Sequence, residues 1–408
     1  MDAVQAPIIA VIGDLMRQVP GTISLGQGVV HYGPPPPAID AVARALADAS
    51  THEYQDGAGL PALRERIAHK LRADNGIDVA GGVGVMVTAG ANMAFMHAVL
   101  AITAPGDEII LNVPFYFNHE MAIQMADCTA VRVATDDRYQ PRLDALRAAI
   151  TERTRAIVTV TPNNPSGAVF GEDTLRAINT LCRERGIYHI SDEVYDYFSY
   201  GSARHVSPGS FPGAEAHTIG MYSLSKAYGF AGWRIGYMTY PEHLTSAIAK
   251  IQDTVLVCPP VASQVAAIAA LDVGRRYCEP HVRELAAIRD IVLSQLSALE
   301  PLASVPAADG AFYCLLKVHT PQDPMTIAER LIREHKVAVV PGPAFGMTDG
   351  CYFRVAYGAL QKATVAEGIG RLVKGLEAIA RADNGAVPTT SLTGSDGEAS
   401  CGRSNTIA

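Results

Sequence analysis

The chain has 408 residues and a mass of 43.2 kDa, which is enough for two or three domains. Hydrophobic residues make up 49% of the sequence and charged residues 18%, so the chain can bury a large core and wholesale disorder is excluded. The net charge of −8 argues against nucleic acid or an anionic membrane as the main partner, because both bind basic surfaces.

The cysteines and the N-terminus carry little functional signal. Seven cysteines are scattered along the sequence without a Cys-x-x-Cys pair, and no His-Glu-x-x-His motif is present. We therefore expect reduced thiols, a cytoplasmic location and no metal centre. The first residues lack the basic segment of a signal peptide, and no stretch reaches the ~18 apolar residues of a membrane span, so no membrane partner is expected.

Apolar runs bounded by turn residues alternate with helical patterns through the middle of the chain. We predict strands over residues 83–88, 108–113, 129–134, 156–161, 187–190, 218–223 and 233–239. We predict helices over residues 91–102, 118–126, 141–151 and 172–185, the last ending at Gly186. Such alternation predicts an α/β fold whose mostly parallel sheet is covered on both faces, and we place this large domain at residues 50–285.

The last third of the chain has a different order of elements. A long amphipathic helix is predicted over residues 279–299 and runs out of the large domain. It is followed by predicted strands at 312–318, 337–340 and 352–356 and by helices at 325–334 and 363–380. We interpret residues 286–382 as a smaller α+β domain, joined by the N-terminal segment 1–49. Residues 383–408 are rich in Gly, Ser and Thr and are expected to form a disordered tail.

Polar residues follow four of the predicted strands. In an open α/β sheet ligands bind beyond the carboxyl ends of the strands, so these residues predict a binding site. The four groups are Asn164 before Pro165, Asp192 with Tyr195, Ser223 and Ser225 before Lys226, and Gly90-Ala91-Asn92 at a helix start.

The glycine-rich helix start predicts an anion site, because free backbone N–H groups and the helix dipole favour a phosphate. Ser223, Ser225 and Arg234 could bind the same anion. A nucleotide P-loop is excluded, since the sequence contains no Gly-Lys dipeptide. A lysine beside phosphate donors, with a carboxylate at a neighbouring strand end, suits pyridoxal phosphate. Lys226 would form the Schiff base, and Asp192 would keep the pyridine nitrogen protonated.

Residues 223–237, Ser-Leu-Ser-Lys-Ala-Tyr-Gly-Phe-Ala-Gly-Trp-Arg-Ile-Gly-Tyr, resemble the lysine signature of class I/II aminotransferases of fold type I, and the resemblance covers about residues 20–380. It implies that Lys226 carries the cofactor and moves protons, that Asp192 pairs with the pyridine nitrogen, and that Asn164 and Tyr195 bind the ring oxygen. The further roles that it implies are a phosphate cup of Gly90, Ala91, Asn92, Ser223, Ser225 and Arg234, ring stacking by Tyr116, contact of Tyr54 with the partner subunit's phosphate, and binding of the substrate by Asn164, Arg354 and Gly28.

The resemblance implies a homodimeric pyridoxal-5′-phosphate enzyme that moves an amino group between an L-amino acid and a 2-oxo acid. A lyase or cyclase acting on an amino acid is the alternative on the same fold, because it would share every cofactor residue. Two more distant alternatives are a regulator with an aminotransferase-like domain, which would need an N-terminal DNA-binding domain, and an unrelated phosphate-sugar binding protein.

One departure from the family bears on the substrate. Dicarboxylate-specific members carry an arginine shortly before an Asn-Pro-Pro segment, where this sequence has Asp253 ahead of Pro259 and Pro260. We therefore expect methionine, aromatic or basic amino acids to be better donors than aspartate and glutamate. The segment around His31 and Tyr32 resembles a plant-like methionine and aromatic aminotransferase group, which favours the same expectation.

Overall fold

The structure is a computed structural model, and it describes residue 1 and residues 4–385. Its largest feature is a seven-stranded sheet with strand order β2-β8-β7-β6-β5-β3-β4. The strands are β2 (Val83–Thr88), β3 (Glu108–Val113), β4 (Thr129–Ala134), β5 (Thr154–Val160), β6 (Tyr188–Asp192), β7 (Thr218–Ser223) and β8 (Gly236–Pro241). Only β8 runs antiparallel to its neighbours, which confirms the predicted mostly parallel α/β sheet.

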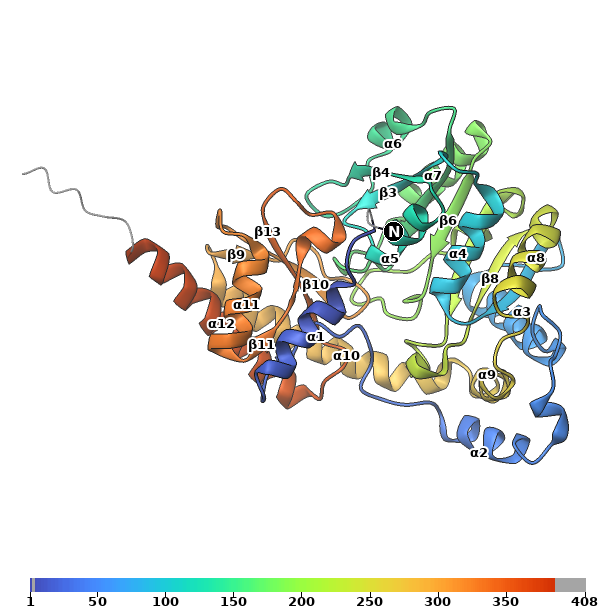
Figure 1. The fold of residues 1–408 in the computed structure, drawn as a ribbon, viewed down its shortest axis with the longest axis horizontal. Coiled ribbons are helices and arrows are strands. Elements are labelled where there is room, and N and C mark those ends of the chain that lie inside the picture. The colour runs from blue at the N-terminus through green and yellow to red at the C-terminus, as the bar shows by residue number, and fades with distance from the viewer. Residues whose placement is uncertain (2–3, 386–408) are drawn as a thin grey trace, which may run out of the picture.

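Helices cover both faces of this sheet, because alternate residues of its strands point to opposite sides. Ile109 and Leu111 pack in a cluster with α4 (Ala91–Ile102), whereas Ile110 packs in another cluster with α7 (Glu172–Arg185). The other helices of this part are α2 (Pro36–Ala45), α3 (Pro61–Asn75), α5 (Phe117–Met125), α6 (Leu143–Ala149), α8 (Thr245–Val255) and α9 (Val261–Val273). Figure 1 shows these helices, with α2 packed against α9 away from the sheet.

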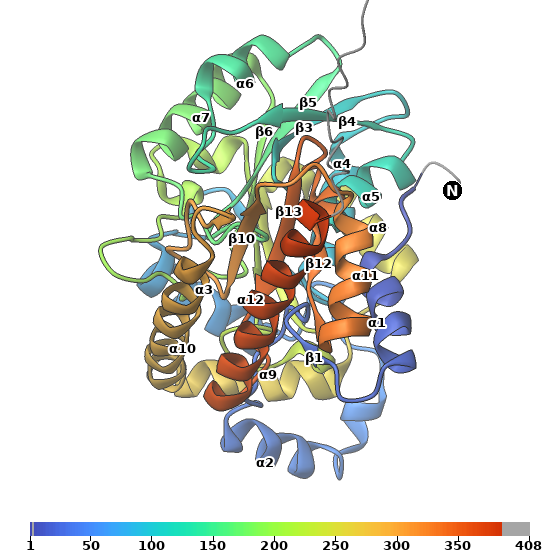
Figure 2. The same cartoon turned by 90° about the vertical axis from the view of Figure 1, so that its left-hand side faces the viewer.

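A smaller antiparallel sheet lies beside the first, with strand order β12-β13-β10-β9. Its strands are β9 (Ala303–Ser304), β10 (Tyr313–Val318), β12 (Val340–Pro341) and β13 (Cys351–Ala356). The chain reaches it through α10 (Arg275–Leu296), and α12 (Lys362–Gly385) lies across it between α10 and α11 (Pro324–His335), as Figure 2 shows.

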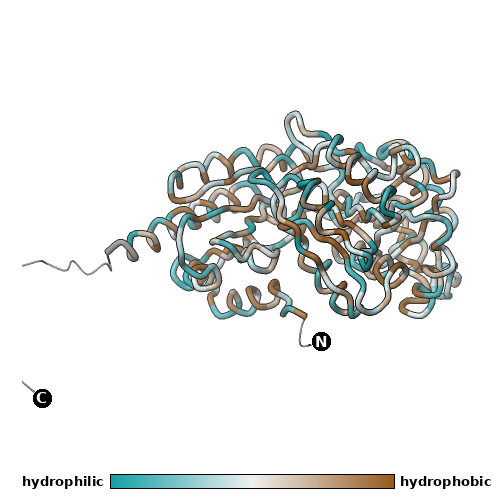
Figure 3. Tube along the Cα trace, turned by 90° about the horizontal axis from the view of Figure 1, so that it is seen from above, coloured by the Kyte–Doolittle hydropathy of each residue, from teal (hydrophilic) through white to brown (hydrophobic). Residues whose placement is uncertain are grey.

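The N-terminal segment packs on this smaller part. β1 (Ile23–Ser24) pairs in parallel with β11 (Val337–Ala338), and α1 (Ile8–Gln18) contacts α11 and β12. Figure 3 shows hydrophobic and hydrophilic residues alternating along the helix next to the N-terminus, which is typical of a helix with one packed face.

Several element boundaries differ from the sequence predictions. The predicted strand 233–239 begins only at Gly236, since Ala231–Trp233 form a 3₁₀ turn and Arg234 has a left-handed φ of 52°. The single strand predicted at 337–340 is two short strands that pair with different sheets. The last helix continues to Gly385, past the predicted tail boundary at Asp383, and the rest of that tail lies outside the described residues.

No helix in residues 4–385 combines the length and the apolar character needed to cross a bilayer. The same part of the chain holds no group of three or more His, Cys, Asp or Glu side chains placed to bind a metal ion.

Candidate active site

A cavity of about 280 Å³ opens where β5, β6 and β7 end. Both sheets and the N-terminal segment contribute to its wall, so residues distant in sequence meet there. The sequence-predicted residues that line it are Gly28, Ala91, Asn92, Tyr116, Asn164, Asp192, Tyr195, Ser223, Ser225, Lys226, Arg234 and Arg354. Its other lining residues are Ile9, Gln27, Val29, Phe117, Val160, Val194, Ala231 and Tyr313.

Lys226 lies in the turn that follows β7 and extends its amine into the cavity. The Nζ atom donates a hydrogen bond of 2.6 Å to the carbonyl oxygen of Gly28. Desolvation, assisted by the positive charge of Arg354, lowers the pKa of Lys226 to about 8, although Asp192 acts in the opposite direction. A substantial fraction of this amine is therefore neutral near physiological pH, which is the form that attacks an aldehyde carbon.

Asp192 is the last residue of β6, and its side chain is only 5% exposed. His119 on α5 lies against it, with Nε2 at 3.1 Å from Oδ2. The His119 ring is in turn stacked on Phe95 of α4, at 4.0 Å between ring centroids. The backbone N–H of Val194 donates to the other carboxylate oxygen at 3.2 Å. The carboxylate is thus held from two sides, and its orientation does not depend on a ligand.

Another part of the cavity wall is built for an anion. Gly90 has a φ of 84° and starts α4, whose first N–H groups belong to Ala91 and Asn92. A Cβ atom at Gly90 would lie 2.5 Å from an Arg234 nitrogen, so glycine allows the guanidinium to approach the helix start. Ser223 Oγ accepts a 3.0 Å bond from the backbone N–H of Ser225, which orients the Ser223 side chain, and both serines line the cavity.

Three further polar side chains, those of Tyr116, Asn164 and Tyr195, line the cavity. Tyr116 is held through its hydroxyl by Asn118, whose amide nitrogen is 2.8 Å away. The Oδ1 atom of Asn164 accepts a 2.9 Å bond from Arg354. The hydroxyl of Tyr195 is 2.8 Å from that of Tyr313, and either oxygen can be the donor.

Arg354 on β13 is a buried cation with neutral partners. It is 2% exposed, and it also donates a 2.7 Å bond to the carbonyl oxygen of Gly26. Its Nε atom has no hydrogen-bond partner, and no carboxylate in the described part of the chain pairs with it. A buried guanidinium without an anion is costly, so the arrangement favours a carboxylate supplied by a ligand.

These features fit pyridoxal phosphate. The cavity presents an amine of lowered pKa, an anion site at a helix start, and a fixed carboxylate. This set of groups suits a ligand with an aldehyde, a phosphate and a basic ring nitrogen. Arg354 has no anionic partner in the described chain, so its positive charge favours the binding of a second molecule that carries a carboxylate.

Tyr54 and Gly90 are the two predicted site residues outside the cavity wall. Gly90 lies directly behind the wall, next to Ala91, and its backbone conformation shapes the anion site. Tyr54 is 82% exposed on the surface of this chain, and the structure does not bring it to the cavity. The predicted contact of Tyr54 is with a partner subunit, so this position leaves that prediction open.

Sequence reasoning missed several residues of the site. His119 could have been noticed as a titratable residue in the first turn of the helix that begins just after Tyr116. Tyr313 and the apolar residues Ile9 and Val29 lie in other parts of the chain, and no local pattern connects them with Lys226. Their roles depend on how the two sheets pack together.

Comparison with known proteins identifies the family. The family model for aminotransferase class I and II matches residues 20–372. An aromatic aminotransferase of Arabidopsis thaliana is 35% identical over 382 residues, which cover 91% of this chain and 94% of the relative. An aspartate/prephenate aminotransferase of Thermus thermophilus is 35% identical over 338 residues, covering 81% of this chain and 86% of the relative.

Solved structures agree with this assignment. The aromatic aminotransferase of Pyrococcus horikoshii matches with a TM-score of 0.84 at 31% identity, over 90% of this chain and 99% of that one. The aspartate aminotransferase of Thermus thermophilus with maleate also gives a TM-score of 0.84, at 32% identity, over 92% and 98% of the two chains. The chain belongs to the class I and II aminotransferases, and it is a pyridoxal 5′-phosphate-dependent transaminase of fold type I.

Proposed function

We propose that this transaminase takes amino donors with aromatic or other large apolar side chains, methionine included, in preference to aspartate and glutamate. The relatives include aromatic and aspartate/prephenate aminotransferases, so the family alone leaves both donor classes open. The observation that carries the proposal is the composition of the cavity wall.

Every cation in the described cavity wall has a partner or an assigned task. Lys226 is the cofactor lysine in our proposal, and Arg234 is bound at the anion end by the carbonyl oxygens of Ala231 and Ala89. Arg354 is left for the α-carboxylate that all amino acids share. A second carboxylate on the donor would therefore have no cation of this chain to bind.

The remaining wall is apolar on one side. Ile9 from α1, Val29 and Phe117 line it, and Phe117 packs against Phe345 at 5.8 Å between ring centroids. Burial of an aromatic or thioether side chain there removes apolar surface from water at ~25 cal/mol per Å². Asp192, which is held by His119, is the one acidic residue in the described wall, so basic donors lack an anionic partner.

The cofactor supplies an electron sink for the charge that develops when the Cα proton of the donor leaves. In our proposal the amine of Lys226 holds the cofactor and then carries that proton. Asp192 keeps the ring nitrogen protonated, while Asn164 and Tyr195 bind the ring oxygen. Arg354 and the backbone of Gly28 orient the substrate carboxylate.

Steady-state kinetics with a panel of donors test the substrate proposal. Phenylalanine, tyrosine, tryptophan and methionine should give higher kcat/KM than lysine and arginine, and higher still than aspartate and glutamate. Aspartate or glutamate as the best donor would overturn the proposal and leave the transaminase assignment intact.

Two neighbouring residues of α1 provide a matched pair of variants. Ile9 lines the cavity, whereas Ile8 packs against the smaller sheet and does not line it. Ile9→Ala should reduce kcat/KM for phenylalanine about tenfold and leave alanine as donor nearly unaffected. Ile8→Ala should leave kcat/KM unchanged for both phenylalanine and alanine. Equal effects of both variants on phenylalanine would show that α1 acts through stability and not through specificity.

We further propose a homodimer in which Tyr54 serves the partner's site. Tyr54 and the nearby Val255 and Val257 are exposed, at 82%, 55% and 40%, and the backbone of Val257 lies against Gly57. A second copy of the chain would cover this apolar surface.

Mixing Tyr54→Ala with Lys226→Ala subunits tests this arrangement. A hybrid dimer would contain one site with an intact Lys226 from one subunit and an intact Tyr54 from the other. Activity at limiting cofactor should therefore recover above that of either variant alone. No recovery in verified hybrids, or a fully active monomer in sedimentation, would contradict the proposal.

We also propose a cytoplasmic location and a division of the chain into two domains. A cytoplasmic location is supported by six described cysteines, all of which are free thiols. A division into a large domain at 50–285 and a small domain at 286–382, joined by residues 1–49, is supported by the separate sheets and by the β1–β11 pairing.

A further inference from the structure

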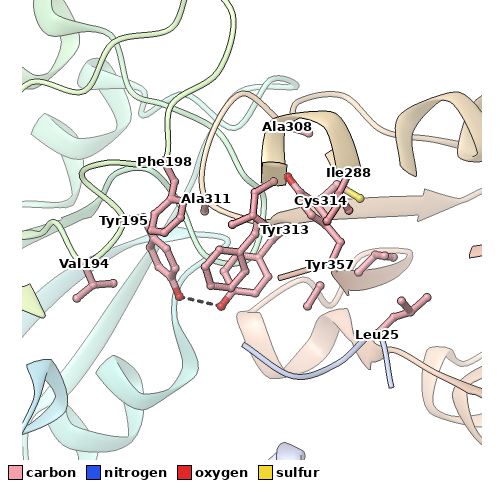
Figure 4. Close-up of a cluster of buried hydrophobic side chains, with 14 of the residues drawn as sticks. Leu25, Val194, Tyr195, Phe198, Ile288, Ala308, Ala311, Tyr313, Cys314 and Tyr357 are labelled. Carbon is pink, nitrogen blue, oxygen red and sulfur yellow. Dashed lines mark hydrogen bonds between the residues drawn. The ribbon is translucent and has the colours of Figure 1, made fainter. Parts of the chain in front are cut away.

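One hydroxyl group in the cavity has no role in the proposed chemistry. It belongs to Tyr313, the first residue of β10, which is 0% exposed. Figure 4 shows this hydroxyl pointing at that of Tyr195, which comes from the loop after β6. The two oxygens are 2.8 Å apart, and the two rings meet edge to face at an interplanar angle of 85°. The pair joins the smaller sheet to the residues around the cofactor site.

The position of the Tyr313 hydroxyl is closely constrained. A Cβ atom on Gly28 would lie 2.6 Å from its oxygen, so only glycine leaves room for it. The guanidinium of Arg354 lies over the Tyr313 ring, at 4.8 Å from the ring centre. On the other side, β10 pairs with β13, and Tyr313 is opposite Ala356. The hydroxyl is therefore held where it can reach Tyr195.

Both phenols of the pair are neutral at physiological pH. Burial raises the pKa of Tyr313 to about 12, and burial together with the neighbouring Tyr313 raises the pKa of Tyr195 well above its ordinary value. Each group thus carries one proton that it can donate in a hydrogen bond. Only one proton can lie between the two oxygens, so its direction depends on the second partner of Tyr195.

We propose that Tyr313 is a positioning residue that donates its proton to Tyr195, so that Tyr195 can donate to the phenolic oxygen of bound pyridoxal phosphate. The inference rests on the proposed role of Tyr195. If Tyr195 donates to the cofactor, its own proton is used, and the bond shared with Tyr313 must be donated by Tyr313. A donor to the Tyr195 oxygen polarises its O–H bond and strengthens the bond that Tyr195 makes to an anionic oxygen.

The consequence is a stabilised negative charge on the cofactor oxygen, with two hydroxyls acting in series. The Tyr313→Phe variant removes only the hydroxyl oxygen that lies farthest from the cofactor in this series. The aromatic ring, its contact with Arg354 and its packing on Tyr195 remain, so the variant is expected to fold. The cofactor oxygen should then be a better base, because its anionic form loses support.

The test is a pH titration of the cofactor absorption band in the holoenzyme without substrate. For Tyr313→Phe the midpoint should rise by about half to one pH unit, which is the value of one ordinary hydrogen bond. Tyr195→Phe should raise it further. The double variant should match Tyr195→Phe alone, because Tyr313 acts only through Tyr195.

Tyr357→Phe is the matched control. Tyr357 is also 0% exposed, does not line the cavity and has a hydroxyl without a hydrogen-bond partner. Its removal should leave the midpoint unchanged.

The outcomes separate the inference from the proposed function. An unchanged midpoint in Tyr313→Phe together with a raised midpoint in Tyr195→Phe overturns the role of Tyr313 alone. Unchanged midpoints in both variants overturn the assignment of Tyr195 to the ring oxygen, and with it this inference. Additive shifts in the double variant would show that Tyr313 acts on the cofactor by a separate route, which also contradicts the proposal.

Discussion

Removal of the Arg354 guanidinium should weaken the enzyme equally for every amino donor. In the variant Arg354→Met the side chain keeps an extended shape but loses its charge and its donors. Asn164 Oδ1 and the Gly26 carbonyl oxygen lose their 2.9 and 2.7 Å bonds, and the substrate carboxylate loses its cation. The effect on kcat/KM combines these losses.

The magnitude follows from the burial of the site. Arg354 is 2% exposed and has no protein carboxylate beside it within the described chain, so its charge is available to the ligand with little screening. Loss of one partner of a buried charge pair costs ~2–5 kcal/mol. At about 1.4 kcal/mol for each factor of ten, kcat/KM should fall by about 30-fold to several thousand-fold.

The assay compares wild type, Arg354→Met and Arg354→Lys with several donors and with an arylalkylamine that has no carboxylate. Arg354→Lys retains a charge without the planar fork and should lie between the other two. The fractional loss should be the same for phenylalanine, methionine and aspartate. It should be much smaller for the amine, which is affected only through the bonds that Asn164 and Gly26 lose. A loss below tenfold, or one confined to aspartate and glutamate, would refute the reasoning. Thermal unfolding of each variant separates a folding defect from a binding defect.

Three further predictions concern titratable groups. Capture of pyridoxal phosphate by the unloaded protein should accelerate with pH and level off above about pH 8, because the Lys226 amine is then neutral; a rate that still rises tenfold between ~pH 9 and 10, as for an ordinary lysine, would contradict this. Asp192→Asn should reduce kcat by about 100- to 1,000-fold with cofactor still bound, and a loss below tenfold would remove Asp192 from its role. Burial, together with the nearby His217, lowers the pKa of His189 from 6.5 to about 3. As the pH falls from 6.5 toward 3, the unfolded state therefore takes up a proton at this residue that the folded state does not. In this pH range the free energy of unfolding should fall by about 1.4 kcal/mol per pH unit because of His189. Urea unfolding at pH 7.5 and at pH 5 should therefore show a smaller loss of stability in His189→Gln than in the wild type.

Much of the large sheet could be predicted because its strands are short apolar runs between turn residues. The strands at 83–88, 108–113, 129–134 and 218–223 have the predicted boundaries, and so does the helix Glu172–Arg185, which ends at a left-handed Gly186. These signals are local, and tertiary packing did not override them.

Elements whose limits depend on tertiary contacts were predicted poorly. The strand β8 starts three residues later than predicted, because Arg234 turns away to reach the anion site. The helix α10 starts at Arg275, ahead of the predicted Glu279, and continues through Pro280. A proline normally marks a helix start, so the pattern alone favoured the later boundary.

The same distinction applies to the site. Lys226, Asp192 and Asn164 follow strands of one sheet, and the parallel topology brings their ends together. Ile9 of the apolar wall and the hydroxyl of Tyr313 come from α1 and β10, which reach the cavity only because the smaller part packs against the larger one. No sequence spacing encodes that packing, so Ile9 and Tyr313 became visible only in the structure.

The most direct test of the central claim is a single-turnover experiment with the holoenzyme, phenylalanine and no oxo acid acceptor. Transamination through Lys226 predicts one equivalent of 2-oxo acid per active site, loss of the cofactor's visible band, and recovery of that band when an oxo acid is added. Lys226→Ala should give none of these changes although it still binds cofactor at the anion site. Free ammonia together with repeated turnover in the absence of an acceptor, or normal conversion by Lys226→Ala, would contradict the account.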